Sequence, residues 1–451
     1  MNLEKFNQFL EDKFMPLAGR IGNQKHLQSV RDGLILTMPL AIAGSIFLIL
    51  AFLPINGYYE FMTGIFGETW MTKFLYPVNV TFDLMAIFAV IGVSYRLAEK
   101  NKIDTLTSVA LALMCFMMLT PFKITGKEEI LSGIPLALTG SGGLFVAIIS
   151  SLLSVELYTY IVKKNIVIKM PENVPPAVAR SFTALIPAIA ILLLSWGVRL
   201  AVETTDFVHL HNVINQALTS PLTKLAGTYL GVMTIILLIQ LFWLAGLHGT
   251  VIVLGVLSPV LGIMGDQNRL AFQAGEEIPH ILGGPFFDLY VTIGGSGGTF
   301  ALALIILLVA KSQQLKEIGK LSIGATFFNI NEPIIFGLPI IMNPYLMIPF
   351  LLTPLVTGSI AYFLIVTGFI AKLPGISIPW TTPPVINGYI ASNGSLSIAL
   401  LQIVLVFIGG AIYYPFIKIY DNEKLKEEKE QEGENERELL NNNFETKGGE
   451  I

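Results

Sequence analysis

Long apolar runs, most of them near the 18 residues that a helix needs to span lipid, alternate with short polar segments along this chain. Membrane barrel strands alternate apolar and polar residues, and these continuous runs do not, so the pattern predicts helices. We expect an all-α, polytopic membrane protein of about ten transmembrane helices. The expected spans are residues 31–53, 82–98, 104–122, 139–162, 181–203, 225–247, 249–264, 292–310, 340–368 and 396–417.

The first 30 residues have a different pattern. Apolar side chains recur there at helical spacing, at Leu3, Phe6, Leu10, Phe14, Leu17 and Ile21. Residues 1–30 are therefore predicted to form an amphipathic helix on the cytoplasmic side. Such a helix either lies on the membrane surface or caps the bundle as an ordinary cytosolic helix, and the spacing does not decide between the two. Charges throughout the segment exclude a signal peptide.

The last segment, residues 421–451, carries 11 acidic and 5 basic side chains. A segment so polar and so poor in aromatic residues is predicted to be a charged, disordered cytoplasmic tail. It carries no candidate site residue, so we expect its deletion to leave activity intact.

Composition supports the membrane assignment. Hydrophobic residues make up 53% of the chain, and charged residues make up 13%, which is about half their share in soluble domains. Basic residues cluster between predicted spans, at Arg96, Lys100 and Lys102, at Lys163, Lys164 and Lys169, and at Lys311, Lys316 and Lys320. Such loops are cytoplasmic, which also places both termini in the cytoplasm. The single cysteine, Cys115, lies in an apolar run and is interpreted as a buried structural thiol.

Motifs of several common site chemistries are absent from the sequence. It contains no P-loop, CxxC, HExxH or nucleophile-elbow pattern, so it predicts no cofactor and no metal site. The glycines of GGSGG (294–298) lack the strand–turn–helix context of a dinucleotide-binding loop. A basic patch with interleaved aromatic residues is also missing, which excludes nucleic acid as a partner.

The second half of the chain differs in texture from the first. Its apolar runs are interrupted by GLHGT (246–250), EEIPHILGGPFFD (276–288), GGSGG (294–298), NINEP (329–333) and PWTTPPVINGYIASNGS (379–395). Irregular backbone at membrane depth is tolerated only inside protein or beside a wet cavity. Broken or re-entrant helices around a midplane site are typical of transporters. We therefore predict a transmembrane scaffold over residues 31–215 and a substrate-binding region with re-entrant hairpins over residues 216–420.

Glu332, in NINEPIIFGLP (329–339), is the leading candidate for the site. A charge at the bilayer centre costs about 2.5–3.5 kcal/mol on insertion scales, so an intramembrane acid usually has a function. Asn331 adds an amide next to it, and Pro333 and Gly337 disfavour regular helix. The alternative is a polar plug that only ties two helices together.

Other candidates have the chemistry to bind a sugar, which presents hydroxyls to amides and carboxylates and ring faces to aromatic residues. They are Asn331, Asp288, Trp243, Trp380 and His248. Each tryptophan has an alternative role in packing or at the membrane interface. A lone histidine in an apolar stretch is usually structural, but a glycine follows His248 at the end of a span, which favours a cavity wall. His280 is the competing histidine.

The motifs together resemble one family, the membrane-embedded IIC components of the bacterial phosphoenolpyruvate-dependent sugar phosphotransferase system. Within that family, the sequence resembles the lactose/cellobiose/N,N'-diacetylchitobiose branch. The resemblance covers residues 1 to about 420, and NINEP with its flanks is its most specific motif. It rests on SVRDGLILTMPL (29–40), KMPENVPPAVARSF (169–182), IPHILGGPFFD (278–288), NINEPIIFGLPIIMNPYLMIPF (329–350) and IPWTTPPVINGYI (378–390).

This resemblance implies a homodimer in the bacterial inner membrane, with most of the dimer contact in the first half. It implies a sugar permease: a disaccharide, diacetylchitobiose or cellobiose, would sit in a closed pocket and be phosphorylated on its 6-hydroxyl. The donor would be a phosphocysteine on a separate IIB protein, because no IIB-like domain follows the last span. Lipid, the disaccharide and phosphorylated IIB are then the partners.

The resemblance assigns the essential pair to Glu332 and His248. Glu332 would orient the attacking hydroxyl and accept its proton, and His248 would orient a hydroxyl or face developing negative charge. Asn331, Asp288, Trp380 and Trp243 would contact sugar. Arg31, in SVRDGL, is a further substrate-binding candidate, and pairing with the adjacent Asp32 is the alternative.

Two other functions stay open at this point. One is an ion-coupled secondary transporter of a polar solute, with Glu332 or Asp288 as the proton site. The other is a membrane-bound enzyme that moves nothing across the bilayer. The chemical form of the delivered solute separates all three functions.

Overall fold

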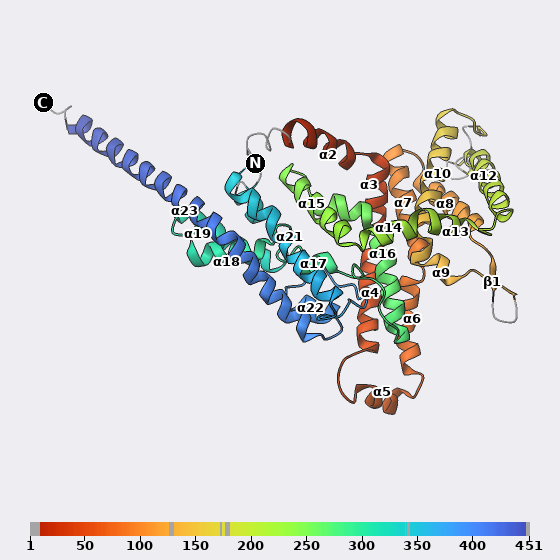
Figure 1. Ribbon diagram of the computed structural model, residues 1–451. Coiled ribbons are helices and arrows are strands. Elements are labelled where there is room, and N and C mark those ends of the chain that lie inside the picture. Colours follow the sequence, from red (N-terminus) through yellow and green to blue (C-terminus); the bar gives the residue numbers. More distant parts are fainter. Residues whose placement is uncertain are drawn as a thin grey trace.

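The computed structural model describes residues 10–125, 130–171, 174–175, 181–338, 340 and 343–447 of the 451-residue chain. Over these ranges nearly all of the regular secondary structure is helical, as Figure 1 shows. The exception is a short antiparallel hairpin of β1 (Lys123–Thr125) and β2 (Ile130–Ser132). The predicted all-α class is therefore confirmed.

The first half of the chain packs around its own helices. α3 packs along α7, α4 packs along α6, and α7, α8 and α10 pack together. The elements are η1 (Leu10–Phe14), α2 (Met15–Gly22), α3 (Lys25–Leu34), α4 (Thr37–Ala51), α5 (Tyr58–Phe66), α6 (Trp70–Phe82), α7 (Met85–Asn101), α8 (Thr105–Leu119), α9 (Leu136–Thr139), η2 (Ser141–Gly143), α10 (Leu144–Lys163), α12 (Leu185–Glu203), α13 (Leu210–Ile214) and η3 (Asn215–Thr219).

Two glycines allow α3 and α7 to approach each other closely. A Cβ atom on Gly33 would lie 2.4 Å from the backbone nitrogen of Val93, and one on Gly92 would lie 2.1 Å from the carbonyl oxygen of Gly33. Any larger residue at either position would force the two backbones apart. The sequence SVRDGL therefore places its glycine where the helix crossing requires it.

The second half packs around α21 and α23. α21 contacts α15 and α23, and α18 contacts α19 and α23. The elements are α14 (Ser220–Ala226), α15 (Tyr229–Leu244), α16 (Gly249–Ala274), α17 (Phe286–Tyr290), α18 (Thr299–Val309), α19 (Gln313–Phe327), α20 (Glu332–Gly337), α21 (Pro344–Val366), α22 (Ile386–Ala391) and α23 (Leu396–Lys447).

The buried side chains form two main apolar clusters, one in each half of the chain. Figure 1 shows these halves side by side, the first in red to yellow and the second in green to blue. α16 lies between them and contacts both α3 and α15. Its Ile263 belongs to the first cluster and its neighbour Met264 to the second. The roles predicted for residues 31–215 and 216–420 remain predictions.

Seven helical stretches of the described residues are long and apolar enough to cross a bilayer, or eight if Leu210–Ala226 (α13, η3 and α14) and α15 form one broken span. These two arms meet at 83°. Two other expected spans, residues 104–122 and 292–310, contain the shorter apolar helices α8 and α18. The expected count of ten is therefore not confirmed. The irregular GGSGG loop takes up the first part of the expected span 292–310, so α18 begins only at Thr299 and is short.

The predicted disordered tail is wrong for residues 421–447, since α23 continues as helix to Lys447 and projects beyond the bundle (Figure 1). Asp421 is buried, and its carboxylate accepts hydrogen bonds from the backbone nitrogens of Lys311 and Ser312 at 2.8–3.0 Å. About two turns further on, Glu428 accepts hydrogen bonds from the backbone nitrogens of Gln313 and Gln314. Asp421 thus binds the two residues before α19 and Glu428 binds its first two residues, so these acids cap the N-terminus of α19 and attach the tail to the bundle.

The predicted N-terminal helix begins before the described residues, so Leu3 and Phe6 lie outside them. A π-helical turn, η1, leads into α2. Phe14 packs edge to face on Phe242 of α15, with ring centroids 5.5 Å apart, while Leu17 is 55% exposed. The segment therefore contacts the bundle on one side and leaves apolar surface open on the other.

Candidate functional site

His248 occupies the turn between α15 and α16, where it caps the N-terminus of α16. Its Nδ1 atom accepts a hydrogen bond from the backbone nitrogen of Val251 at 3.3 Å. Gly249 is required here, because a Cβ atom at this position would lie 1.9 Å from the carbonyl oxygen of Ile239. Since Nδ1 is an acceptor, the neutral ring carries its proton on Nε2. The donor side of the imidazole therefore faces away from the helix.

Trp243 forms the wall behind this imidazole. The two ring centroids lie 4.4 Å apart at an interplanar angle of 47°. Trp243 is 5% exposed, and its Nε1 atom donates to Oγ1 of Thr250 at 3.3 Å. This geometry matches the packing alternative for Trp243, and its predicted sugar contact stays a prediction.

Glu332 stands at the start of the short helix α20, directly after the buried Asn331. The amide nitrogen of Asn331 donates to the carbonyl oxygen of Ser296 at 3.4 Å. A Cβ atom on Gly295 would lie 2.5 Å from Cβ of Asn331, so the GGSGG loop packs directly against this amide. The loop thus supports the backbone from which the Glu332 carboxylate projects.

The structure brings the two leading candidates together. Nε2 of His248 lies 3.9 Å from Oε1 of Glu332. The side chains are 45% and 46% exposed, respectively. Over the part of the chain that the structure describes, these side chains therefore face open space, and the closed pocket that the resemblance implied is not formed around them. The physical reason is that both residues stand on turns at helix ends, where side chains project away from the packed cores.

Asn329 ties three irregular segments together beside this pair. Its backbone has a φ of +62°, which turns the amide away from the preceding helix, α19. The side-chain nitrogen donates to the carbonyl oxygens of Trp380 at 2.7 Å and Thr382 at 2.9 Å, and its oxygen accepts from the backbone nitrogen of Gly294 at 2.8 Å. The Trp380 side chain itself is about half exposed. Its predicted sugar contact stays a prediction.

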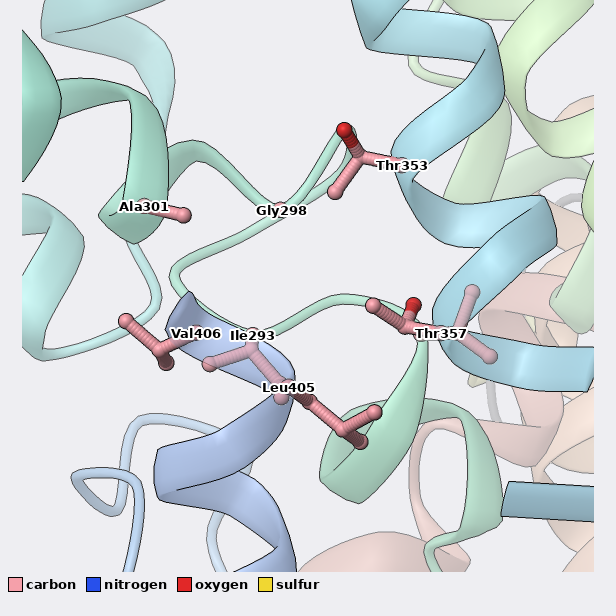
Figure 2. A pocket seen from close by; sticks show the side chains of 8 residues that line it. Ile293, Gly298, Ala301, Thr353, Thr357, Leu405 and Val406 are labelled. Atoms are coloured by element: carbon pink, nitrogen blue, oxygen red, sulfur yellow. The ribbon is translucent and has the colours of Figure 1, made fainter. Parts of the chain in front are cut away.

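A small cavity lies behind the GGSGG loop, as Figure 2 shows. Gly298 and Ile293 of the loop region face Thr353 and Thr357 of α21 across it, and Leu405 of α23 closes one side. Its volume is about 10 Å³, which holds a single water molecule at most. This cavity is far too small for a sugar, so it is a packing defect beside the site.

Among the described residues, three other candidates form no hydrogen bond or ion pair with His248 or Glu332. Asp288 is on α17, and among the described residues no side chain or backbone group hydrogen-bonds to its carboxylate. Arg31 pairs with Asp32 at 2.6 Å, the alternative given above, and a Cβ atom on Gly255 of α16 would touch its stem. His280, the competing histidine, contacts Gln267 through Nε2 at 2.5 Å.

Sequence reasoning did not select Thr250 or Ser296. Their hydroxyl oxygens lie 2.6 Å apart and link the turn of His248 to the GGSGG loop. Their positions in the sequence are the one feature that could have indicated them: Thr250 is two residues after His248, and Ser296 is the polar centre of GGSGG. In the part of the chain that the structure describes, no cluster of three or more His, Cys, Asp or Glu side chains is arranged to hold a metal ion.

Comparisons with known proteins agree on one family. The family described as Phosphotransferase system, EIIC matches residues 31–354. The lichenan permease IIC component of Bacillus subtilis (strain 168) is 49% identical over 95% of this chain and 97% of its own length. A cellobiose-specific EIIC component of Geobacillus stearothermophilus is 50% identical over 94% of this chain and 96% of its own length.

A solved structure has the same fold. The crystal structure of the transporter ChbC, described as the IIC component from the N,N'-diacetylchitobiose-specific phosphotransferase system, superposes with a TM-score of 0.91. It is 46% identical in sequence and covers 93% of this chain and 99% of its own. Similarity this extensive includes both halves of the chain.

Proposed function

Because this chain belongs to the EIIC family of the phosphotransferase system, a family of sugar permease components in the membrane, we propose that it imports a disaccharide and presents its 6-hydroxyl for phosphorylation. The phosphoryl donor is a phosphocysteine on a separate IIB protein. Diacetylchitobiose or cellobiose is the proposed substrate, which the descriptions of the solved structure and of one relative support.

One observation carries the proposed chemistry, the 3.9 Å separation of His248 Nε2 from Glu332 Oε1. A hydroxyl oxygen can lie within hydrogen-bonding distance, about 2.8 Å, of both atoms at once, since they are closer than twice that distance. In that position the hydroxyl donates to the carboxylate and accepts from the Nε2–H of the imidazole. Both groups then act on a single sugar oxygen.

The reaction needs positioning more than covalent help. The 6-hydroxyl oxygen attacks the phosphorus atom, the new O–P bond forms, and the S–P bond of the phosphocysteine breaks with release of the IIB thiolate. Glu332 accepts the hydroxyl proton as the oxygen attacks. His248 holds the same oxygen in line through its Nε2–H. The half-exposed side chains of the pair support this role, because a second protein has to reach them.

Other features of the proposal concern the assembly. The protein is a homodimer in the bacterial inner membrane, with both termini in the cytoplasm. Residues 31–215 form the scaffold and dimer contact, and residues 216–420 bind the sugar. The packing supports this division, since the segments of His248, Glu332, Asn331 and Trp380 all belong to the second half. Asn331, Asp288, Trp380, Trp243 and Arg31 are proposed to contact the substrate.

Membrane vesicles given phosphoenolpyruvate, the soluble phosphotransferase components and labelled disaccharide test this function. We expect sugar phosphate inside the vesicles, formed only when the IIB protein is present. Uptake of unmodified sugar driven by a proton gradient alone would instead support an ion-coupled transporter. Diacetylchitobiose, cellobiose and lactose as competing substrates measure the preference.

A further inference from the structure

A chain of hydrogen bonds connects the surroundings of His248 to those of Glu332. It starts at Nε1 of Trp243, which donates to Oγ1 of Thr250 at 3.3 Å. Thr250 shares a 2.6 Å hydrogen bond with the hydroxyl of Ser296. The carbonyl oxygen of Ser296 then accepts from the amide of Asn331 at 3.4 Å. The chain therefore runs between three segments, the α15–α16 turn, the GGSGG loop and the start of α20.

Each end of this chain fixes one member of the His248–Glu332 pair. Trp243 packs at a tilt of 47° against the imidazole of His248, and Thr250 lies in the same first helical turn that His248 caps. At the other end, Asn331 is bonded directly to Glu332 along the backbone. A change in the Thr250–Ser296 distance would therefore move the imidazole relative to the carboxylate.

Burial makes this link expensive to break. Trp243, Ser296 and Asn331 are 5%, 3% and 4% exposed. An indole N–H is a donor only, so Oγ1 of Thr250 must accept the hydrogen bond from Trp243. The Thr250 hydroxyl still has a proton and a second lone pair with which it can bond to Ser296. With the hydroxyl of residue 250 removed, the indole N–H loses its partner in a poorly solvated place. The turn or the loop would then shift to find new partners.

We propose that Thr250 and Ser296 are positioning residues that set the distance between His248 and Glu332 for phosphoryl transfer. This inference rests on the proposed function of the site. Neither hydroxyl touches the sugar or the phosphoryl group. They act through the imidazole and the carboxylate, so their loss affects the rate of transfer more than the binding of substrate.

The Thr250→Val variant tests the proposal, because valine keeps the β-branched shape and removes both hydrogen bonds. In the vesicle assay we expect kcat to fall about 10²-fold, the usual effect of a misplacement near 1 Å, with KM for the sugar within about twofold. Thr250→Ser keeps the hydroxyl and should restore most of kcat. Thr234→Val is the matched control, because among the described residues the Thr234 hydroxyl bonds only the Leu230 carbonyl within α15.

A spectroscopic readout separates positioning from general damage. Difference ultraviolet resonance Raman spectra against Trp243→Phe report whether the Trp243 indole N–H is hydrogen-bonded. We expect this signal to change in Thr250→Val and to be unchanged in Thr250→Ser and Thr234→Val. Ser296→Ala is a second variant that removes one hydroxyl while it keeps the carbonyl that Asn331 uses. It should also lower kcat without raising KM, and it decides the question if Thr250→Val does not fold.

The outcomes distinguish this inference from the proposed function. Wild-type protein that produces no sugar phosphate would overturn the proposed function. Wild-type protein that does produce it, together with a Thr250→Val or Ser296→Ala variant that matches it in kcat, would overturn the positioning role alone. A rise in KM with unchanged kcat would also overturn it, because that pattern indicates a lost substrate contact.

Discussion

Arg269 of α16 donates from Nη2 to Oδ1 of Asp83 at 3.1 Å, across the boundary between the two halves of the chain. The same guanidinium pairs with Asp266 at 2.7 Å and lies 4.7 Å from the ring centroid of Phe82. Arg269 is 1% exposed, so these contacts replace water around a buried charge. Because α16 begins next to His248, the ion pair fixes the opposite end of the helix that carries the imidazole.

We therefore expect Arg269→Met to lower the free energy of unfolding by about 3–5 kcal/mol, the usual cost of removing one partner of a buried ion pair. The carboxylates of Asp83 and Asp266 would then lie near each other without a cation. Thermal unfolding of the purified protein in detergent measures the loss. Arg96→Met is the control, since its pair with Glu99 is about half exposed and such pairs contribute about 0–1 kcal/mol. Equal Tm values for the two variants would contradict the expectation.

Glu332→Gln should abolish most phosphorylation while the protein stays folded. The substitution keeps shape and hydrogen bonding but removes the proton acceptor, so we expect the rate to fall about 10²–10⁴-fold. Because the Glu332 side chain is 46% exposed, the Tm should change little. Glu317→Gln, an exposed acid on α19 that pairs with Lys320, is the control and should keep full activity. Wild-type activity in Glu332→Gln would remove Glu332 from the chemistry.

His248 has two functions that substitutions can separate. It caps α16 through Nδ1, and it faces Glu332 through Nε2. His248→Ala should lose both, with a helix-cap cost of about 0.5–2 kcal/mol and loss of phosphorylation. His248→Asn can still accept from the Val251 backbone, so we expect near-normal Tm and loss of phosphorylation. If His248→Asn phosphorylates sugar at the wild-type rate, the imidazole has only the capping function.

Only the first part of the charged end of α23 should be needed for stability, and the rest should be dispensable for stability and transport. Deletion of residues 432–451 leaves Asp421 and Glu428 in place, and we expect stability and transport to be unchanged. Deletion of residues 421–451 removes both caps of α19 and should lower Tm. Asp421→Ala alone should cost about 1–3 kcal/mol, because backbone N–H groups lose their acceptor. Equal Tm values for the two truncated proteins would show that the caps do not stabilise α19.

Two glycine-to-alanine substitutions should have opposite effects. Gly33→Ala places a methyl group 2.4 Å from the Val93 backbone, so we expect a loss of about 1–3 kcal/mol from the strain of overpacking. Gly64 lies in α5 with open space around it. There alanine should stabilise the protein by about 0.4–1 kcal/mol, since it restricts the unfolded chain. Thermal unfolding in detergent measures both, and a Gly33→Ala protein as stable as Gly64→Ala would contradict the close approach of α3 and α7.

The sequence was informative about local structure and about chemistry. Apolar runs predicted helices because hydrocarbon leaves no other partner for backbone groups, and breaks such as GGSGG predicted where the helices stop. The unusual setting of Glu332 identified it as a site candidate without any knowledge of its neighbours. These inferences use only the residue and its immediate surroundings in the chain. For the same reason the composition of the tail predicted disorder where residues 421–447 form helix, because composition does not reveal that Asp421 and Glu428 cap another helix.

The sequence by itself determined a membrane-embedded, helical chain with the motifs of its family, and it pointed to a candidate polar site in the second half. Only the tertiary structure decided that His248 and Glu332 lie 3.9 Å apart, that Thr250 and Ser296 join their surroundings, and that the pair faces open space. Helix formation depends on groups a few residues apart along the chain. The distance between two turns depends on how distant helices pack, and no local pattern encodes it.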